Sequence, residues 1–217
     1  MNESRKTFHA ELKELENEML KMGSVVGESI RKSIESLINK DIDLADQVIE
    51  DDDIIDDYEV ELEEKCTRLI ALQQPVAIDL RKIIVISKLA TDLERIGDHA
   101  SNIAYRVKEI GEDKLIKQME NLPKMTDIVV ERLQNSLKAF VNMDIELAEK
   151  VIDRDEEVDL FDEQIQAELT SAMREDCNSI DQGTSLMFIS RYLERIGDHS
   201  TNICERTIYM KTGNRDI

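Results

Sequence analysis

Apolar residues recur at steps of three and four along the first forty positions. This spacing puts them on one face of a long helix. A second stripe of this kind, from Leu44 to Leu69, predicts a second helix with Asp41 at its N-cap. Pro75 ends it, because proline disfavours helical geometry at Gln74. The stripe of the first helix consists of Phe8, Leu12, Leu15, Met19, Met22, Val26, Ile30, Ile34 and Leu37.

The remaining chain continues the helical pattern. A third helix is predicted from about Val76 to Ile110, with Gly111 as its stop. Residues 112–120 are polar and read as a linker. Three more helices are predicted to begin near Asn121, Asp144 and Ser179, the last with a capping box between Ser179 and Gln182 and an end before Gly213.

The second half of the chain repeats the first. The seven residues Leu93–His99 recur letter for letter as Leu193–His199, at an offset of 100. Earlier in each half, Leu44–Ile49 corresponds to Leu147–Ile152 at an offset of 103, so the second half has a shorter loop before its last helix. We therefore predict an all-α fold of two tandem up-down-up three-helix bundles related by internal duplication, with residues 1–111 and 121–217 as the halves.

Composition supports the helical prediction and narrows the function. Aromatic residues make up 4% of the chain, with 7 Gly and 2 Pro, which is too few for a typical β-protein. The net charge of −20 repels phosphate backbones and anionic lipids, so we expect neither nucleic-acid binding nor direct membrane insertion. An odd number of cysteines, no CxxC pair, and a charged stretch from Met1 to Leu15 predict a cytoplasmic protein without a signal peptide.

Four pairs of acidic residues stand four positions apart, two pairs in each half. Residues at this spacing lie on one helical face, where like charges repel unless water screens them or a cation bridges them. Both pairs of the first half are reproduced in the second, which argues against an accidental origin of the spacing. The pairs are Asp52 with Asp56, Glu94 with Asp98, Asp155 with Asp159, and Glu194 with Asp198.

The helical wheel places these carboxylates beside the apolar stripe rather than within it. If neighbouring antiparallel helices turn these flanks toward each other, four carboxylates per half converge on a groove. Such hard oxygen ligands suit magnesium, manganese, calcium or iron. The spacing alone leaves two other interpretations open: a solvated acidic face, or local neutralisation by Arg95 and Arg195.

Little in the sequence favours catalysis. There is no glycine-rich phosphate loop or nucleophile elbow, and His99 and His199 follow Glu94 and Glu194 by five residues, which breaks the ExxH register of di-iron bundles. Gly97 and Gly197 lie on the core side of their helices and predict close helix approach rather than chemistry. The roles of Asp79 and Arg81, just after the proline, stay open between a helix-start charge pair and a binding site.

At the repeated Leu-Glu-Arg-Ile-Gly-Asp-His motif, the chain resembles the PhoU family, and the likeness extends over nearly its whole length. The segment Gln73–Arg81 and the motif Arg191–Tyr192 before the second copy add to it. The resemblance implies two three-helix bundles and bound metal ions, as multinuclear iron or zinc clusters, with Asp52, Asp56, Glu94, Asp98, Asp155, Asp159, Glu194 and Asp198 as ligands; magnesium or manganese is an alternative.

It also implies a cytosolic, non-enzymatic regulator, which we expect to be a homodimer. Members of the family limit uptake by the high-affinity phosphate ABC transporter and, with a sensor histidine kinase, repress the phosphate-starvation response. Two other classes remain as alternatives: a metal-dependent helical-bundle enzyme of the di-iron type, and a metal-free structural scaffold.

Overall fold

The computed structural model describes residues 3–111, 114–116 and 119–214, and within these ranges the chain is helical and contains no β-strand. The first half comprises α1 (Glu3–Asn39), α2 (Ile42–Glu50), α3 (Asp52–Gln73) and α4 (Ala77–Ile110). The second half comprises α5 (Asn121–Asn142), α6 (Ile145–Ile152), α7 (Asp155–Glu175), the 3₁₀ turn η1 (Cys177–Ser179) and α8 (Ile180–Thr212).

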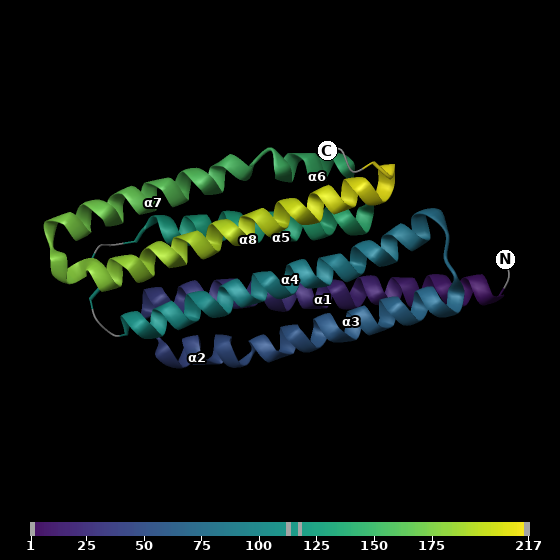
Figure 1. Ribbon diagram of the computed structural model, residues 1–217, viewed down its shortest axis with the longest axis horizontal. Helices are drawn as coiled ribbons and strands as arrows, with labels where there is room; N and C mark the ends of the chain where they lie inside the picture. The colour runs from purple at the N-terminus through teal and green to yellow at the C-terminus, as the bar shows by residue number, and fades with distance from the viewer. Residues whose placement is uncertain (1–2, 112–113, 117–118, 215–217) are drawn as a thin grey trace.

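The helices form two bundles that lie side by side (Figure 1). In the first, α1 and α4 pack together and α2 with α3 covers the outer side; in the second, α5 and α8 pack together under α6 and α7. The bundles join where α4 lies antiparallel to α8 and where α1 meets α5. Arg81 near the start of α4 donates to the Met210 carbonyl near the end of α8 (3.0 Å), which gives this arginine a structural contact. The predicted all-α, duplicated fold is confirmed.

The second helix of each half is broken, and the prediction of one continuous helix there was wrong. The breaks fall at Asp51 and at residues 153–154. Both new helices begin with consecutive acidic residues: Asp52 and Asp53 in the first turn of α3, and three acids in that of α7. Negative charge is favourable at a helix N-terminus and unfavourable in a helix interior beside other acids. The clustered acids therefore favour a fresh helix start.

The predicted caps fared differently from one another. Asp41 caps α2 by accepting from the Leu44 amide (2.9 Å), as predicted, and Asp144 repeats this at α6. The capping box at Ser179 is wrong, because the Ser179 hydroxyl donates instead to the Asp176 carbonyl (2.6 Å). Asp176 has already closed the η1 turn with its own side chain, so the serine lies at the end of that turn.

The other half of the predicted capping box makes a tertiary contact. The Gln182 side-chain oxygen accepts from the Ile116 amide (2.6 Å) in the predicted linker. Part of this linker, residues 112–113 and 117–118, lies outside the described residues. In its described part, Leu115 and Ile116 pack against the core, so this stretch is less polar than the sequence suggested.

The predicted apolar stripes form the core. All nine members of the α1 stripe are buried, together with the central residues of α4 and α8 such as Leu93 and Leu193. Cys66 and Cys204 are buried free thiols, and Cys177 is exposed. None of the described helices combines the length and the apolar character that crossing a bilayer requires.

Candidate metal centre

A glycine lets α3 approach α4 closely beside the first acidic pairs. A Cβ atom built at Gly97 would lie 2.9 Å from Ile55 Cδ1 and 3.2 Å from Asp52 Oδ1. The absence of a side chain at this position therefore lets the N-terminal turn of α3 rest directly on α4. The close approach predicted for Gly97 is present, and it brings an aspartate with it.

The four acidic residues of the first half lie in one another's electrostatic field. Burial, and then the Asp98 carboxylate, raises the pKa of Asp52 to about 6 and that of Glu94 to about 7. The same two causes raise the pKa of Asp56. Asp98 on α4 therefore lies close enough to α3 for its charge to act on two aspartates there. We call these four residues, Asp52, Asp56, Glu94 and Asp98, the first acidic set.

Two further residues belong to this neighbourhood and were missed from the sequence. Glu59 on α3 also raises the pKa of Glu94, and the buried Ser101 hydroxyl donates to Asp52. Glu59 follows Asp56 by three positions and so lies on the same helical face, a signal that could have identified it. Ser101 could be found only from the packing of α4 against α3.

The second half brings its own four acids together. Burial, and then Asp155, raises the pKa of Asp198, and Asp159 adds to this. Burial, and then Asp198, raises the pKa of Glu194. The helices α7 and α8 thus repeat the arrangement of α3 and α4. We call Asp155, Asp159, Glu194 and Asp198 the second acidic set.

An arginine that the sequence reasoning missed enters the second acidic set from α5. Arg132 is 1% exposed, and its Nη2 atom donates to Asp155 Oδ1 (2.5 Å) and to the Thr201 hydroxyl (2.8 Å). At the edge of the set, Arg191 pairs with Glu194 (2.9 Å). By contrast, no member of the first acidic set forms an ion pair with a described lysine or arginine.

The histidines of the repeated motif lie elsewhere, as the register predicted. The His99 and His199 rings face each other across the contact between α4 and α8, with centroids 5.7 Å apart. His199 Nδ1 lies 3.3 Å from Asp92 Oδ1, and Arg206 donates to Asp92 Oδ2 (2.7 Å). Asp92 is buried; burial alone would raise its pKa, but the bonds from His199 and Arg206 lower it. This cluster joins the two bundles.

The first acidic set fits a hard cation in its donor chemistry. Burial, and then neighbouring carboxylates, raise the pKa values of Asp52, Asp56 and Glu94, and only for Glu94 does a basic side chain, Arg95, act in the opposite direction. A cation bound here would relieve the repulsive part of this effect. The fit is not ready-made: among the described residues, no three His, Cys, Asp or Glu side chains are already arranged to hold a metal ion. Binding would require these side chains to rotate toward a shared ion.

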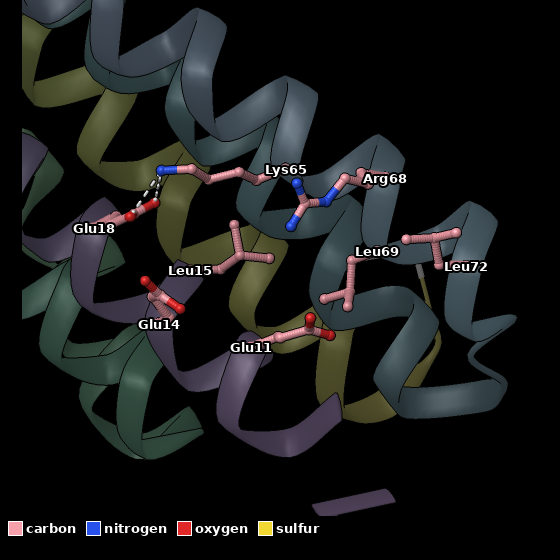
Figure 2. Close-up of a pocket in the computed structure, with 8 residues that line it drawn as sticks. All are labelled: Glu11, Glu14, Leu15, Glu18, Lys65, Arg68, Leu69 and Leu72. Carbon is pink, nitrogen blue, oxygen red and sulfur yellow. Dashed lines mark hydrogen bonds and ion pairs between the residues drawn. The ribbon is translucent and has the colours of Figure 1, made fainter. Parts of the chain in front are cut away.

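A small cavity between α1 and α3 lies apart from both acidic sets (Figure 2). It has a volume of about 130 Å³ and is open to one side of the first bundle. Lys65 reaches across it to Glu18, with both carboxylate oxygens 2.8 Å away. Its lining contains none of the predicted site residues: Glu11, Glu14, Leu15, Glu18, Lys65, Arg68, Leu69 and Leu72.

Comparison with known proteins gives consistent results over the whole chain. The family model described as "PhoU domain" matches residues 19–107 and 122–207, once in each half. A phosphate-specific transport system accessory protein PhoU homolog from Clostridium acetobutylicum is 43% identical over 97% of this chain and 96% of that protein. The homolog from Aquifex aeolicus is 41% identical over 94% of this chain and 92% of its own length.

Solved structures agree in fold as well as in sequence. The crystal structure of PhoU from Pseudomonas aeruginosa superposes with a TM-score of 0.90 at 38% identity, covering 95% of this chain and all of that chain. The crystal structure of the phosphate transport system regulatory protein PhoU from Streptococcus pneumoniae has the same TM-score at 34% identity, covering 97% of this chain and 99% of that one.

Proposed function

The chain belongs to the PhoU family, and we propose from this premise that it is a cytosolic accessory protein that limits uptake by the high-affinity phosphate ABC transporter. With a sensor histidine kinase, it would also repress the phosphate-starvation response. The observation that carries the proposal is similarity to proteins named for phosphate transport and its regulation. It extends over nearly the full length of both aligned chains, at 34–43% identity.

In this proposal the protein is an adaptor with no chemistry of its own. The two bundles dock on the cytosolic side of the transporter and on the kinase. The net charge of −20 favours basic partner surfaces, since opposite charges steer association. The homodimer predicted from the sequence is part of the proposal, and light scattering on the purified protein checks it.

The first acidic set gives the adaptor a way to respond to metal ions. Asp52 and Asp56 would supply ligands from α3, and Glu94 and Asp98 from α4. A bound cation supplies positive charge that offsets the repulsion among these residues. The two helices would thereby be fixed against each other, and the local surface offered to a partner would become less negative. Iron, zinc, manganese and magnesium remain candidates, as single ions or as a multinuclear cluster.

Deletion of the gene tests the regulatory role. When phosphate is plentiful, the deletion strain is expected to take up more phosphate and to express starvation genes, and the wild-type gene is expected to reverse both. Unchanged uptake and unchanged expression in the deletion strain would refute the proposal.

Complementation with variants tests the metal role separately. Glu94→Gln with Asp98→Asn removes two ligands and is expected to restore regulation poorly. A matched control, Glu63→Gln with Glu64→Gln, removes two exposed carboxylates from the outer face of α3. If both double variants restore regulation equally, the acidic set has no special role in it.

A further inference from the structure

The two acidic sets differ by one buried residue on the first helix of each half. The N-caps Asp41 and Asp144 hold equivalent places, so the offset between the halves is 103 in this region. Arg132 on α5 therefore corresponds to Ser29 on α1. Both positions are buried, at 1% and 6% exposure. The duplication has thus placed a cation in the second bundle where the first has a small hydroxyl.

Arg132 lies against Gly197 of α8, and in the first half Asp52 lies against the equivalent Gly97 of α4. A Cβ atom at Gly197 would lie 3.3 Å from Arg132 Nη1, whereas the polar atom nearest to a Cβ at Gly97 is Asp52 Oδ1. The Arg132 guanidinium binds Asp155, the counterpart of Asp52. Its Nε and Nη1 atoms are buried and have no hydrogen-bond partner among the described residues.

A buried guanidinium with two unpartnered nitrogens needs nearby negative charge. Burying an ion without compensation is strongly unfavourable, so such a residue persists only where other charges stabilise it. Around Arg132 that charge comes from Asp155, at hydrogen-bond distance, and from Glu157, whose pKa the arginine helps to lower. Arg132 and Asp155 stabilise each other, so this aspartate already has a cationic partner at the place where a metal ion would otherwise bind it.

Other basic residues reinforce the difference between the halves. Arg191 pairs with Glu194, and the residue that corresponds to it in the first half is Thr91. Arg154 at the start of α7 pairs with Glu131 and Glu157, and it corresponds to Asp51. Of these two arginines, Arg191 is the one that pairs with a member of the second acidic set.

We propose that the second acidic set is not a metal site in this chain, because the Arg132 guanidinium is a built-in cation that takes the place of the metal ion. Metal binding is then confined to the first bundle. The inference rests on the proposed metal role of the first acidic set, but it makes its own claim about Arg132. One bundle then responds to metal and the other does not.

Manganese binding to purified protein tests this directly. Chelator-treated protein is titrated with Mn²⁺, free ion is followed by electron paramagnetic resonance, and bound ion is counted by elemental analysis after gel filtration. Glu94→Gln with Asp98→Asn is expected to abolish binding, and Glu194→Gln with Asp198→Asn is expected to leave it unchanged. Arg132→Ser, which copies Ser29, is expected to double the bound manganese, and Arg132→Lys, which keeps the charge, is expected to add none.

The outcomes of the manganese experiment distinguish this inference from the proposed function. Manganese that still binds after Glu94→Gln with Asp98→Asn, and is lost when the second set is also removed, would overturn the inference and leave a metal role in place. Failure of a folded Arg132→Ser protein to gain manganese would overturn it too. If wild type binds none and Arg132→Ser binds some, the claim about Arg132 holds and the first acidic set fails as a metal site. Should Arg132→Ser not fold, the wild type and the two double variants still decide.

Discussion

Replacing Gly97 with alanine tests whether the close approach of α3 to α4 depends on the absence of a side chain at this position. Alanine normally stabilises a helix interior by about 1 kcal/mol relative to glycine. Here its Cβ atom would lie 2.9 Å from Ile55 Cδ1 and 3.0 Å from Ile55 Cγ2. Ile55 is fully buried, and a β-branched side chain in a helix has essentially one χ1 rotamer. The Cγ2 atom therefore cannot swing away, and the helices must move apart.

The expected magnitude follows from these opposing effects. Overpacking a well-packed core costs typically 1–3 kcal/mol, so about 2 kcal/mol less the helix gain leaves a net destabilisation of about 1 kcal/mol. Gly27 on α1 is the matched control, because a Cβ there would have no atom of the described residues within 4 Å. Gly27→Ala is expected to gain about 1 kcal/mol from helix propensity alone.

Thermal and urea unfolding of the metal-free proteins measure the difference. The two variants should differ by about 2 kcal/mol, which corresponds to about 4–8 °C in Tm for a chain of this size. Gly97→Ala should also weaken manganese binding, since the new Cβ would lie 3.2 Å from Asp52 Oδ1. A Gly97→Ala protein as stable as Gly27→Ala would show that the close approach is not tight, and the reasoning would fail.

Three further predictions concern charge. The folded-state pKa of Glu94, about 7, lies above its ordinary value, so the folded protein binds more protons than the unfolded chain, and the stability of the metal-free protein should fall between about pH 4.5 and pH 7. In urea unfolding, this decrease in stability should be smaller by about 1 kcal/mol in Glu94→Gln than in wild type, after discounting for solvent screening. Identical pH profiles for the two proteins would refute this. Manganese at about 100 times its Kd should stabilise wild type by about 2.7 kcal/mol at pH 7.5, measured as a rise in Tm. The double variant Glu94→Gln with Asp98→Asn should show no such rise. An equal rise in Tm in both proteins would contradict metal binding at the first acidic set. Asp92→Asn leaves Arg206 and His199 without their buried partner and should lower the free energy of unfolding in urea by about 2–3 kcal/mol. The control Asp127→Asn breaks an exposed pair with Arg31 and should lower it by less than about 1 kcal/mol. Equal losses in the two variants would show that the Asp92 cluster has no special role.

The sequence by itself determined the all-helical class, the duplication and the faces that carry the acids, but not the break in the second helix of each half. Helical periodicity is a local property, so the stripe from Phe8 to Leu37 could be read without knowledge of its neighbours. The cap at Asp41 involves a residue only three positions away, and its prediction held. The capping box at Ser179 failed although it is equally local, because Asp176 offered a competing turn.

Only the tertiary structure decided which charges meet. That Asp98 acts on Asp52 and Asp56 depends on the register of α3 against α4, which Gly97 and Ile55 set through contacts between residues about forty positions apart. The entry of Arg132 into the second acidic set depends on a third helix and leaves no mark in the spacing of the acids. Helix-internal spacing fixes where a side chain points on its own helix, whereas its charged neighbours are fixed by packing between helices that are distant in sequence.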